Sequence, residues 1–381
     1  GADYIRFLLG EHFTTQKVFE KVPVKTSFLD HTEDQYDSDE LEELDEDEIT
    51  YTVTEQSKLR AKEIKDYISS LKSAAVHWYN TFNPINNPDL TQEESLWLER
   101  INRLGILYFR PLITASLMKE SITSEQRVRL FREIERFIFI TFRLGRSLSN
   151  YRNSEFYRAT RELLRGEITI DDIIESLNNN MSWSFYEGED GSMYFDPSHF
   201  QKYIQKKFNS RHGTGFYSWT GLRYFMFEYE MQKVRERGSQ KIDWELFTKS
   251  DKDRVSIEHI YPQTPDKSCW NEHFGSLDDK ERHILTHNLG NLLPLSMSVN
   301  ASLQNDCFEK KKEAVIDKGV KKREGYNNGS HSEIEVAQYR TWSPQTIEQR
   351  GLKLLSFMEK RWGIPIENEQ KKKELLFLRG N

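Results

Sequence analysis

The stretch VSIEHIYPQ, residues 255–263, is the most informative part of this sequence. Its first six residues predict a short β-strand, and Pro262 predicts that the strand ends there. Neighbouring residues on a strand point to opposite faces of a sheet. Glu258 and His259 can therefore share one site only if that site lies at the end of the strand.

The residue types in and after this stretch suit the hydrolysis of a phosphodiester. That reaction needs a base to deprotonate water and a cation to neutralise the charge that develops on the phosphate. A neutral imidazole such as His259 suits the first task. Asn291 follows 32 residues later and Asn300 nine after that, and a carboxylate and an amide oxygen are ligands that Mg²⁺ accepts.

Outside this region, the apolar spacing predicts helices over most of the chain. A second short strand, bent by glycine and proline, is expected at residues 289–295, and helix is expected again over residues 300–318. The last long helix is predicted to begin at Ser343-Pro344, because serine is a good N-cap and proline suits the first helical position.

These motifs resemble those of the C-terminal nuclease family of GmrSD-type modification-dependent restriction enzymes and of the related SspE phage-defence proteins. The resemblance covers roughly residues 200–362, and the region before it matches more loosely. The short sequence motifs that carry the resemblance are Ile257-Glu258-His259-Ile260-x-Pro262-Gln263, His287-Asn288-Leu289-Gly290-Asn291-Leu292, Asn300, Phe308-x-x-Lys311-Lys312 and Trp342-x-x-x-x-Ile347-x-x-Arg350.

The resemblance implies a role for each matching residue. His259 would be the general base, Glu258 a metal ligand, Asn291 the asparagine that braces the catalytic loop, and Asn300 the second metal ligand. The motif around Glu258 and His259 and its spacing to Asn300 also resemble the HNH domain of RNA-guided CRISPR effector nucleases, where an aspartate stands in place of Glu258. The implied cofactor is Mg²⁺ or Mn²⁺.

Four other residues of these motifs are candidates for contacts to DNA phosphates, namely His287, Lys311, Lys312 and Arg350. Each also has a structural alternative: lysine runs usually lie on solvated helix faces, and Arg350 could bridge carboxylates instead of binding a phosphate. Asn291 could likewise be a turn residue, and Asn300 a helix N-cap.

Composition limits the other functions. The 381 residues include only two cysteines, Cys269 and Cys307, which excludes a disulfide-rich secreted scaffold and fits a reducing cytoplasm. A structural zinc site is not expected, because no CxxC pair exists and Cys269 with His273 supplies only two ligands. No apolar run is long enough to cross a membrane, and no HExxH motif points to a metalloprotease.

The net charge of −7 comes from one acidic segment. Residues 30–48 contain 12 Asp or Glu and no Lys or Arg, so the rest of the chain has a net charge of +5. The segment is interpreted as a disordered linker, with a DNA-mimicking flap as the alternative. Residues 127–165 carry ten Arg against four Glu, which indicates either an ordinary charged surface or a track for DNA phosphates.

We therefore expect a mainly α-helical protein, with a helical domain followed by a small ββα-metal (HNH) nuclease motif embedded in helices. The expected parts are the end of an N-terminal domain at 1–29, an acidic linker at 30–56, a helical domain at 57–185, the nuclease domain at 200–365 and a charged tail at 366–381. The family's nucleotide-handling N-terminal domain is not found in this sequence and is expected as a partner on the same protein.

The expected function is metal-dependent nicking or cleavage of DNA in the cytoplasm, in defence against foreign or modified DNA. The alternative is a non-enzymatic DNA-binding or regulatory fragment whose nuclease site is silent without the N-terminal domain. No partner membrane is expected, and assembly into a homodimer is left open.

Overall fold

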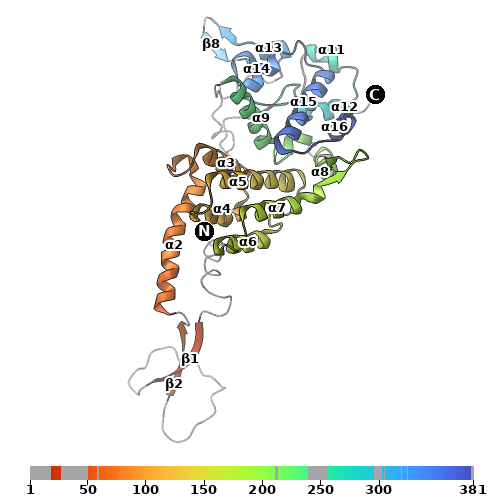
Figure 1. The fold of residues 1–381 in the computed structure, drawn as a ribbon. Coiled ribbons are helices and arrows are strands. Elements are labelled where there is room, and N and C mark those ends of the chain that lie inside the picture. The colour runs from red at the N-terminus through yellow and green to blue at the C-terminus, as the bar shows by residue number, and fades with distance from the viewer. Residues whose placement is uncertain are drawn as a thin grey trace. The chain divides into compact units, whose positions relative to one another are not determined.

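The computed structural model describes residues 19–26, 50–57, 60–210, 213–238, 256–295, 303, 305–318, 320–323 and 325–378. The chain divides into two compact units, and Figure 1 shows the elements of both. Helices dominate the described residues and the strands form only two-stranded ladders, so the expected mainly α class is confirmed. No helix among these residues is long and apolar enough to cross a membrane.

The first unit contains residues up to 91 together with 107–127 and 152–169. Aromatic packing joins its helices, since the rings of Phe109 and Phe156 lie 4.8 Å apart. The Arg110 guanidinium lies 3.6 Å from the centre of the Phe82 ring and donates to Thr81 Oγ1 at 2.8 Å. The elements of this unit are β1 (Phe19–Thr26), β2 (Thr50–Ser57), α2 (Ala61–Phe82), η1 (Pro84–Asn86), η2 (Leu107–Phe109), α4 (Arg110–Met118) and α6 (Asn153–Arg165).

The start of the chain differs from the expectation at one boundary. Residues 50–56, the end of the predicted acidic linker, lie in β2, which pairs antiparallel with β1. The alternation of threonine with other residues in this segment favours a strand once a partner is present. The remainder of the predicted linker, residues 30–49, lies outside the described residues.

The second unit contains residues 92–106, 128–151 and the rest of the chain from 170. Its elements before residue 255 are α3 (Gln92–Leu104), most of α5 (Ser124–Ile138), η3 (Phe139–Leu144), α7 (Ile170–Met181), η4 (Ser182–Ser184), β3 (Phe185–Glu187), β4 (Met193–Phe195), α8 (Ser198–Phe208), η5 (Gly215–Ser218) and α9 (Leu222–Arg237). The aromatic residues of α9 are mostly buried, which makes this helix a central element of the unit.

Within the VSIEHIYPQ stretch (residues 255–263), Ile257–His259 form β5, and this strand pairs antiparallel with β6 (Leu292–Pro294). In this register Glu258 lies opposite Leu293 and His259 opposite Leu292. Between them lie η6 (Ser268–Trp270), α11 (Asn271–Phe274), α12 (Asp279–Thr286) and η7 (Leu289–Asn291). Both predicted strands are thus present, each three residues long.

The elements after β6 are α13 (Phe308–Lys312), β7 (Val315–Asp317), β8 (Val320–Arg323), η8 (Tyr326–Asn328), α14 (His331–Ala337), α15 (Pro344–Trp362) and α16 (Glu369–Leu375). The helix expected over residues 300–318 is present as α13 at residues 308–312 but is wrong at its end, because residues 315–317 pair as a strand with β8. The β-branched pair Val315-Ile316 favours a strand over a helix here.

The start of α15 agrees with its prediction, since the Ser343 hydroxyl accepts a hydrogen bond from the Thr346 amide. The C-terminal segment is more than a charged tail: α16 forms within it, and Leu375 and Leu376 are buried. The apolar Leu-Leu pair at residues 375–376 explains the difference, because it is buried, while the partly buried Lys372 and Lys373 before it form ion pairs with Glu359 and Glu348.

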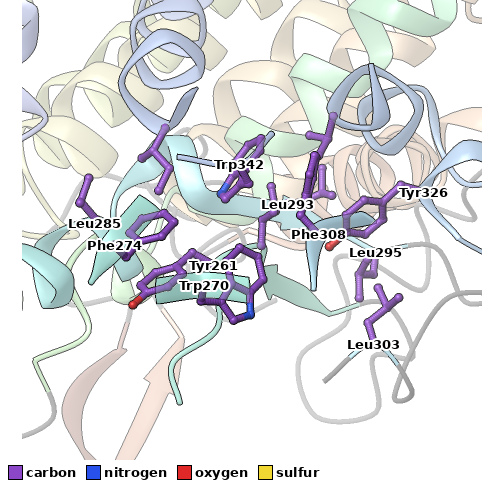
Figure 2. Close-up of a cluster of buried hydrophobic side chains, with 13 residues drawn as sticks. Tyr261, Trp270, Phe274, Leu285, Leu293, Leu295, Leu303, Phe308, Tyr326 and Trp342 are labelled. Atoms are coloured by element: carbon purple, nitrogen blue, oxygen red, sulfur yellow. The ribbon is translucent and has the colours of Figure 1, made fainter. Parts of the chain in front are cut away.

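A cluster of 13 buried hydrophobic side chains supports the β5–β6 pair (Figure 2). Leu293 and Leu295 reach it from β6 and the residue following that strand, and Ile260 and Tyr261 reach it directly after β5. The Tyr261 ring stacks on Phe274, with ring centres 3.8 Å apart. The cluster holds the end of β5 against the helices that follow it.

The two cysteines are joined. A disulfide links Cys269 in η6 to Cys307, the residue that precedes α13, and it connects positions 38 residues apart. Sequence analysis expects reduced cysteines, and this pairing differs from that expectation. Spacing alone carries no signal for it, because the two segments come together only through the hydrophobic cluster around Trp270 and Phe308.

Candidate active site

Asn291 determines how the chain leaves β5. Its side-chain oxygen accepts from the Tyr261 amide at 2.7 Å and from Trp342 Nε1 at 2.9 Å. Its side-chain nitrogen donates to the carbonyls of Tyr261 at 2.9 Å and of Thr286 at 2.8 Å. The fully buried amide thus makes four hydrogen bonds, and three of them hold backbone groups. This is the geometry of a loop brace.

Arg350 supports the same turn from α15. Its Nη1 donates to the Gly290 and Leu292 carbonyls, each at 2.7 Å, and the side chain is fully buried. Gly290 lies so close to α15 that a Cβ on it would be 2.0 Å from the Ile347 carbonyl oxygen. The placement of Arg350 therefore fits bracing of the turn and does not fit the predicted phosphate contact, since solvent and DNA cannot reach it.

His259 is the last residue of β5 and its imidazole is 7% exposed. Its Nε2 lies 3.1 Å from His287 Nδ1, and Gln263 Nε2 lies 3.1 Å from its Nδ1. The Tyr217 ring covers it at a centroid distance of 4.7 Å. One nitrogen of the His259–His287 contact must donate and the other accept, so one proton is shared between the two rings there.

Both imidazoles of this contact are held neutral. Burial, then the neighbouring His287 and Lys311, lowers the pKa of His259 to about 3. Burial, then His283, lowers the pKa of His287 to about 4. A neutral ring keeps a lone pair that can accept a proton, which is the first requirement of a general base.

Glu258 lies on the other face of β5, as strand geometry requires. Its carboxylate oxygen Oε1 is 2.6 Å from Lys311 Nζ, and its side chain is 18% exposed. Lys311 also donates to the carbonyls of His259 at 3.3 Å and Ile260 at 3.1 Å. The lysine thus links α13 to the end of β5 and to the carboxylate.

The two lysines predicted to bind DNA phosphates are engaged within the protein. Lys311 is fully buried and its ammonium contacts three acceptors. Lys312 Nζ pairs with Glu309 at 2.9 Å and lies 3.3 Å from the Tyr339 carbonyl. Their placement does not support the predicted phosphate contacts, because the α13 helix turns both side chains inward.

The donor groups can be tested against the expected divalent cation. The described residues contain no group of three or more His, Cys, Asp or Glu placed to hold a metal ion. Glu258 supplies one partly exposed carboxylate, which fits an ion such as Mg²⁺ that takes one or two protein carboxylates and fills its other positions with water and phosphate. Asn300, the other predicted ligand, lies outside the described residues.

Sequence reasoning identified the residues at the centre of this site but missed some of their neighbours. Tyr217, Gln263 and His283 contact or flank the histidine pair, and no spacing pattern in the sequence points to Tyr217 or His283. Gln263 lies within residues 255–263, and its position four residues after His259 could have indicated a contact with that histidine. The ion pair between Glu258 and Lys311 spans 53 residues and could not be inferred from spacing.

Comparison with known proteins agrees with the sequence-based resemblance. Residues 202–357 match the family model of the GmrSD restriction endonucleases, C-terminal domain. No curated protein and no solved structure matched the chain. The matched segment contains β5, β6 and every described residue of the candidate site. The resemblance is thereby confirmed for this part of the chain: residues 202–357 are similar to the C-terminal domain of the GmrSD restriction endonucleases.

Proposed function

We propose that this protein is a metal-dependent HNH-type endonuclease that nicks or cleaves DNA, in defence against foreign or modified phage DNA. The name of the matched family, a restriction endonuclease domain, supports hydrolysis of DNA as the reaction. The observation that carries the proposal is the position of His259 at the end of β5, directly after Glu258 in the chain, where the Asn291 side chain holds the backbone of Tyr261 in the turn that follows.

In this proposal His259 accepts a proton from the attacking water. A pKa of about 3 keeps the ring neutral at physiological pH but makes it a weak base, whereas a general base works best with a pKa near the working pH. An anionic phosphate bound beside the ring would favour its charged form and raise its pKa. We therefore propose that binding of the DNA backbone raises the pKa of His259 toward the working pH.

Glu258, with Asn300, would hold the divalent cation. When bound, the cation neutralises charge on the phosphate and on the leaving oxygen. Lys311 is held 2.6 Å from the same carboxylate, so it balances the charge of Glu258 in the structure described here. DNA, a cytoplasmic location and a nucleotide-handling domain elsewhere on the same protein are further parts of the proposal.

One observation favours the alternative of a DNA-binding fragment with a silent site. His259 is almost fully buried and Glu258 is neutralised by Lys311, which is the arrangement expected of an inactive state. Under this alternative the chain binds DNA but does not cut it at any concentration of metal.

The Glu258→Gln variant tests the role of the carboxylate. Glutamine keeps an oxygen that can accept from Lys311 but loses the charge that attracts a cation. We expect Mn²⁺ affinity, measured by isothermal titration calorimetry, to fall roughly tenfold or more, and plasmid nicking to require correspondingly more Mn²⁺.

The matched control is Glu309→Gln, which removes an exposed carboxylate paired with Lys312 on the neighbouring helix α13. Its Mn²⁺ titration should equal that of the wild type. Identical titrations and nicking curves for Glu258→Gln, Glu309→Gln and wild type would contradict a metal role for Glu258.

A further inference from the structure

The second unit contains a basic cavity, made of residues that take no part in the candidate active site. Its volume is about 510 Å³, within the range typical of small-molecule sites. The lining comes from α3, α5, α9 and α15 and their ends, and we call it the four-helix cavity: Trp97, Arg100, Arg132, Glu133, Arg136, Gln232, Arg235, Phe357, Lys360, Arg361, Trp362 and Gly363. Six of these twelve residues are cationic and one is acidic.

Two of the guanidiniums are fixed by buried carboxylates. Arg100 Nε and Arg361 Nε lie 2.8 Å from the two oxygens of Glu228, and Arg361 also pairs with Glu135 at 3.1 Å. Burial raises the pKa of Glu228, but Arg361 and Arg100 lower it further than burial raises it, so the carboxylate stays charged. The positions of these two arginines are therefore set before any ligand arrives.

The other four cations leave an excess of positive charge. Arg132 and Arg136 share a single carboxylate, Glu133, at 3.5 and 3.7 Å. Arg235 and Lys360 are exposed and have no ion-pair partner among the residues that the structure describes. Six cations against the three carboxylates of Glu133, Glu135 and Glu228 leave a net charge of +3 around one cavity.

An excess of like charges within one cavity raises the local concentration of anions and favours a ligand of opposite charge. Guanidinium groups match phosphate oxygens in geometry and bind them through paired hydrogen bonds. The six cations come from four helices and line one open pocket. This arrangement suits several phosphates joined to one another, whereas a DNA strand presents its phosphates one at a time along its length.

We propose that the four-helix cavity binds a compact polyphosphate, the chemistry found in inorganic triphosphate and in the phosphate tail of a nucleoside triphosphate. Arg100 and Arg361 form the preorganised base of this site, and Arg235 and Lys360 close it from the exposed side. Trp97 is partly exposed, and its ring is contacted by Arg100 at 4.6 Å and by Arg361 at 5.2 Å. This inference goes beyond the proposed nuclease function and does not rest on it.

The test uses the full chain and three probes, namely inorganic triphosphate, ATP and a single-stranded DNA oligonucleotide of eight thymidines. Binding is measured by isothermal titration calorimetry at physiological salt for wild type and for the double variant Arg235→Gln/Lys360→Gln. Both side chains are exposed and have no ion pair within the described part of the chain, so folding should be unaffected. The control Lys202→Gln/Lys206→Gln removes two exposed charges from α8, outside the cavity.

We expect wild type and control to bind triphosphate and ATP, and the double variant to bind both roughly tenfold more weakly or worse. Equal affinities for the two ligands would identify the phosphate chain as the whole of the recognised group, and tighter binding of ATP would identify a nucleotide site. No binding of either ligand, equal losses in the double variant and the control, or binding of the oligonucleotide alone would overturn the proposal.

Discussion

At the scale of single residues, the candidate site depends on side chains that form hydrogen bonds to backbone amides and carbonyls. Asn291 makes four hydrogen bonds from a fully buried amide, and Arg350 binds two carbonyls of the same turn. A buried polar group that loses its partners carries a full desolvation cost, so each of these contacts matters more than its average strength. His259 is held in place because the turn after it is held.

Replacement of Asn291 by alanine should therefore reduce the stability of the whole domain. It leaves the Tyr261 amide and the Trp342 indole without their acceptor, and we expect the free energy of unfolding to fall by about 3 kcal/mol. Denaturant titration measures this loss. Asn327→Ala, which removes an exposed amide that binds Glu313, serves as the control and should change stability little. Equal stabilities of the two variants would refute the bracing role.

At the scale of elements, one carboxylate joins three helices. Glu335 on α14 accepts from Tyr229 on α9 at 2.8 Å, and it forms ion pairs with Lys233 on α9 and with Lys353 on α15, the latter at 2.7 Å. Burial raises the pKa of Glu335, but hydrogen bonds and charge from the two lysines outweigh burial and bring it down to about 2. The domain is therefore fixed around a charged group that must stay ionised.

This pKa predicts how stability depends on pH. In the unfolded chain the glutamate has its ordinary pKa of 4.5, so the folded state gains stability from Glu335 above pH 4.5 and loses it as pH falls toward 2. The shift corresponds to about 3 kcal/mol. Glu335→Gln should be less stable than wild type at pH 7, and the difference should shrink as pH falls below 4.5.

Unfolding by urea at a series of pH values from 7 to 3 checks this outcome. Glu367→Gln is a suitable comparison, because that carboxylate is exposed and accepts a hydrogen bond from the Tyr186 hydroxyl. A stability difference between Glu335→Gln and wild type that stays constant from pH 7 to pH 3 would show that the lysine pairs do not lower the pKa of Glu335.

At the scale of the whole molecule, the sequence predicts the class of fold and the centre of the site. Local patterns suffice for the short strand at His259, for the start of α15 at Ser343 and for the mainly helical content. They suffice because each depends on residues close together in the chain, such as an N-cap followed by proline or an apolar run ended by Pro262.

Features that depend on distant residues could not be predicted in this way. The burial of Lys311 against Glu258, the burial of Arg350 under η7 and the disulfide between Cys269 and Cys307 all follow from tertiary packing. A lysine in a run of three gives no sign that it will be buried, since most such runs lie on solvated helix faces. Lys311 and Arg350, both predicted to contact phosphates, are fully buried and donate to acceptors within the protein.

The central claim is that His259 is the general base of a DNA nuclease. The most direct test is nicking of supercoiled plasmid across a Mn²⁺ series by wild type, His259→Ala, the similarly sized His259→Asn and the control His199→Ala, whose exposed ring lies against Trp183. We predict that both His259 variants bind DNA, lose about 10²–10⁴ in rate and are not rescued by added metal, while His199→Ala nicks like wild type. Nicking at the wild-type rate by either His259 variant, or no nicking by the wild type at any concentration of Mn²⁺, would contradict the claim.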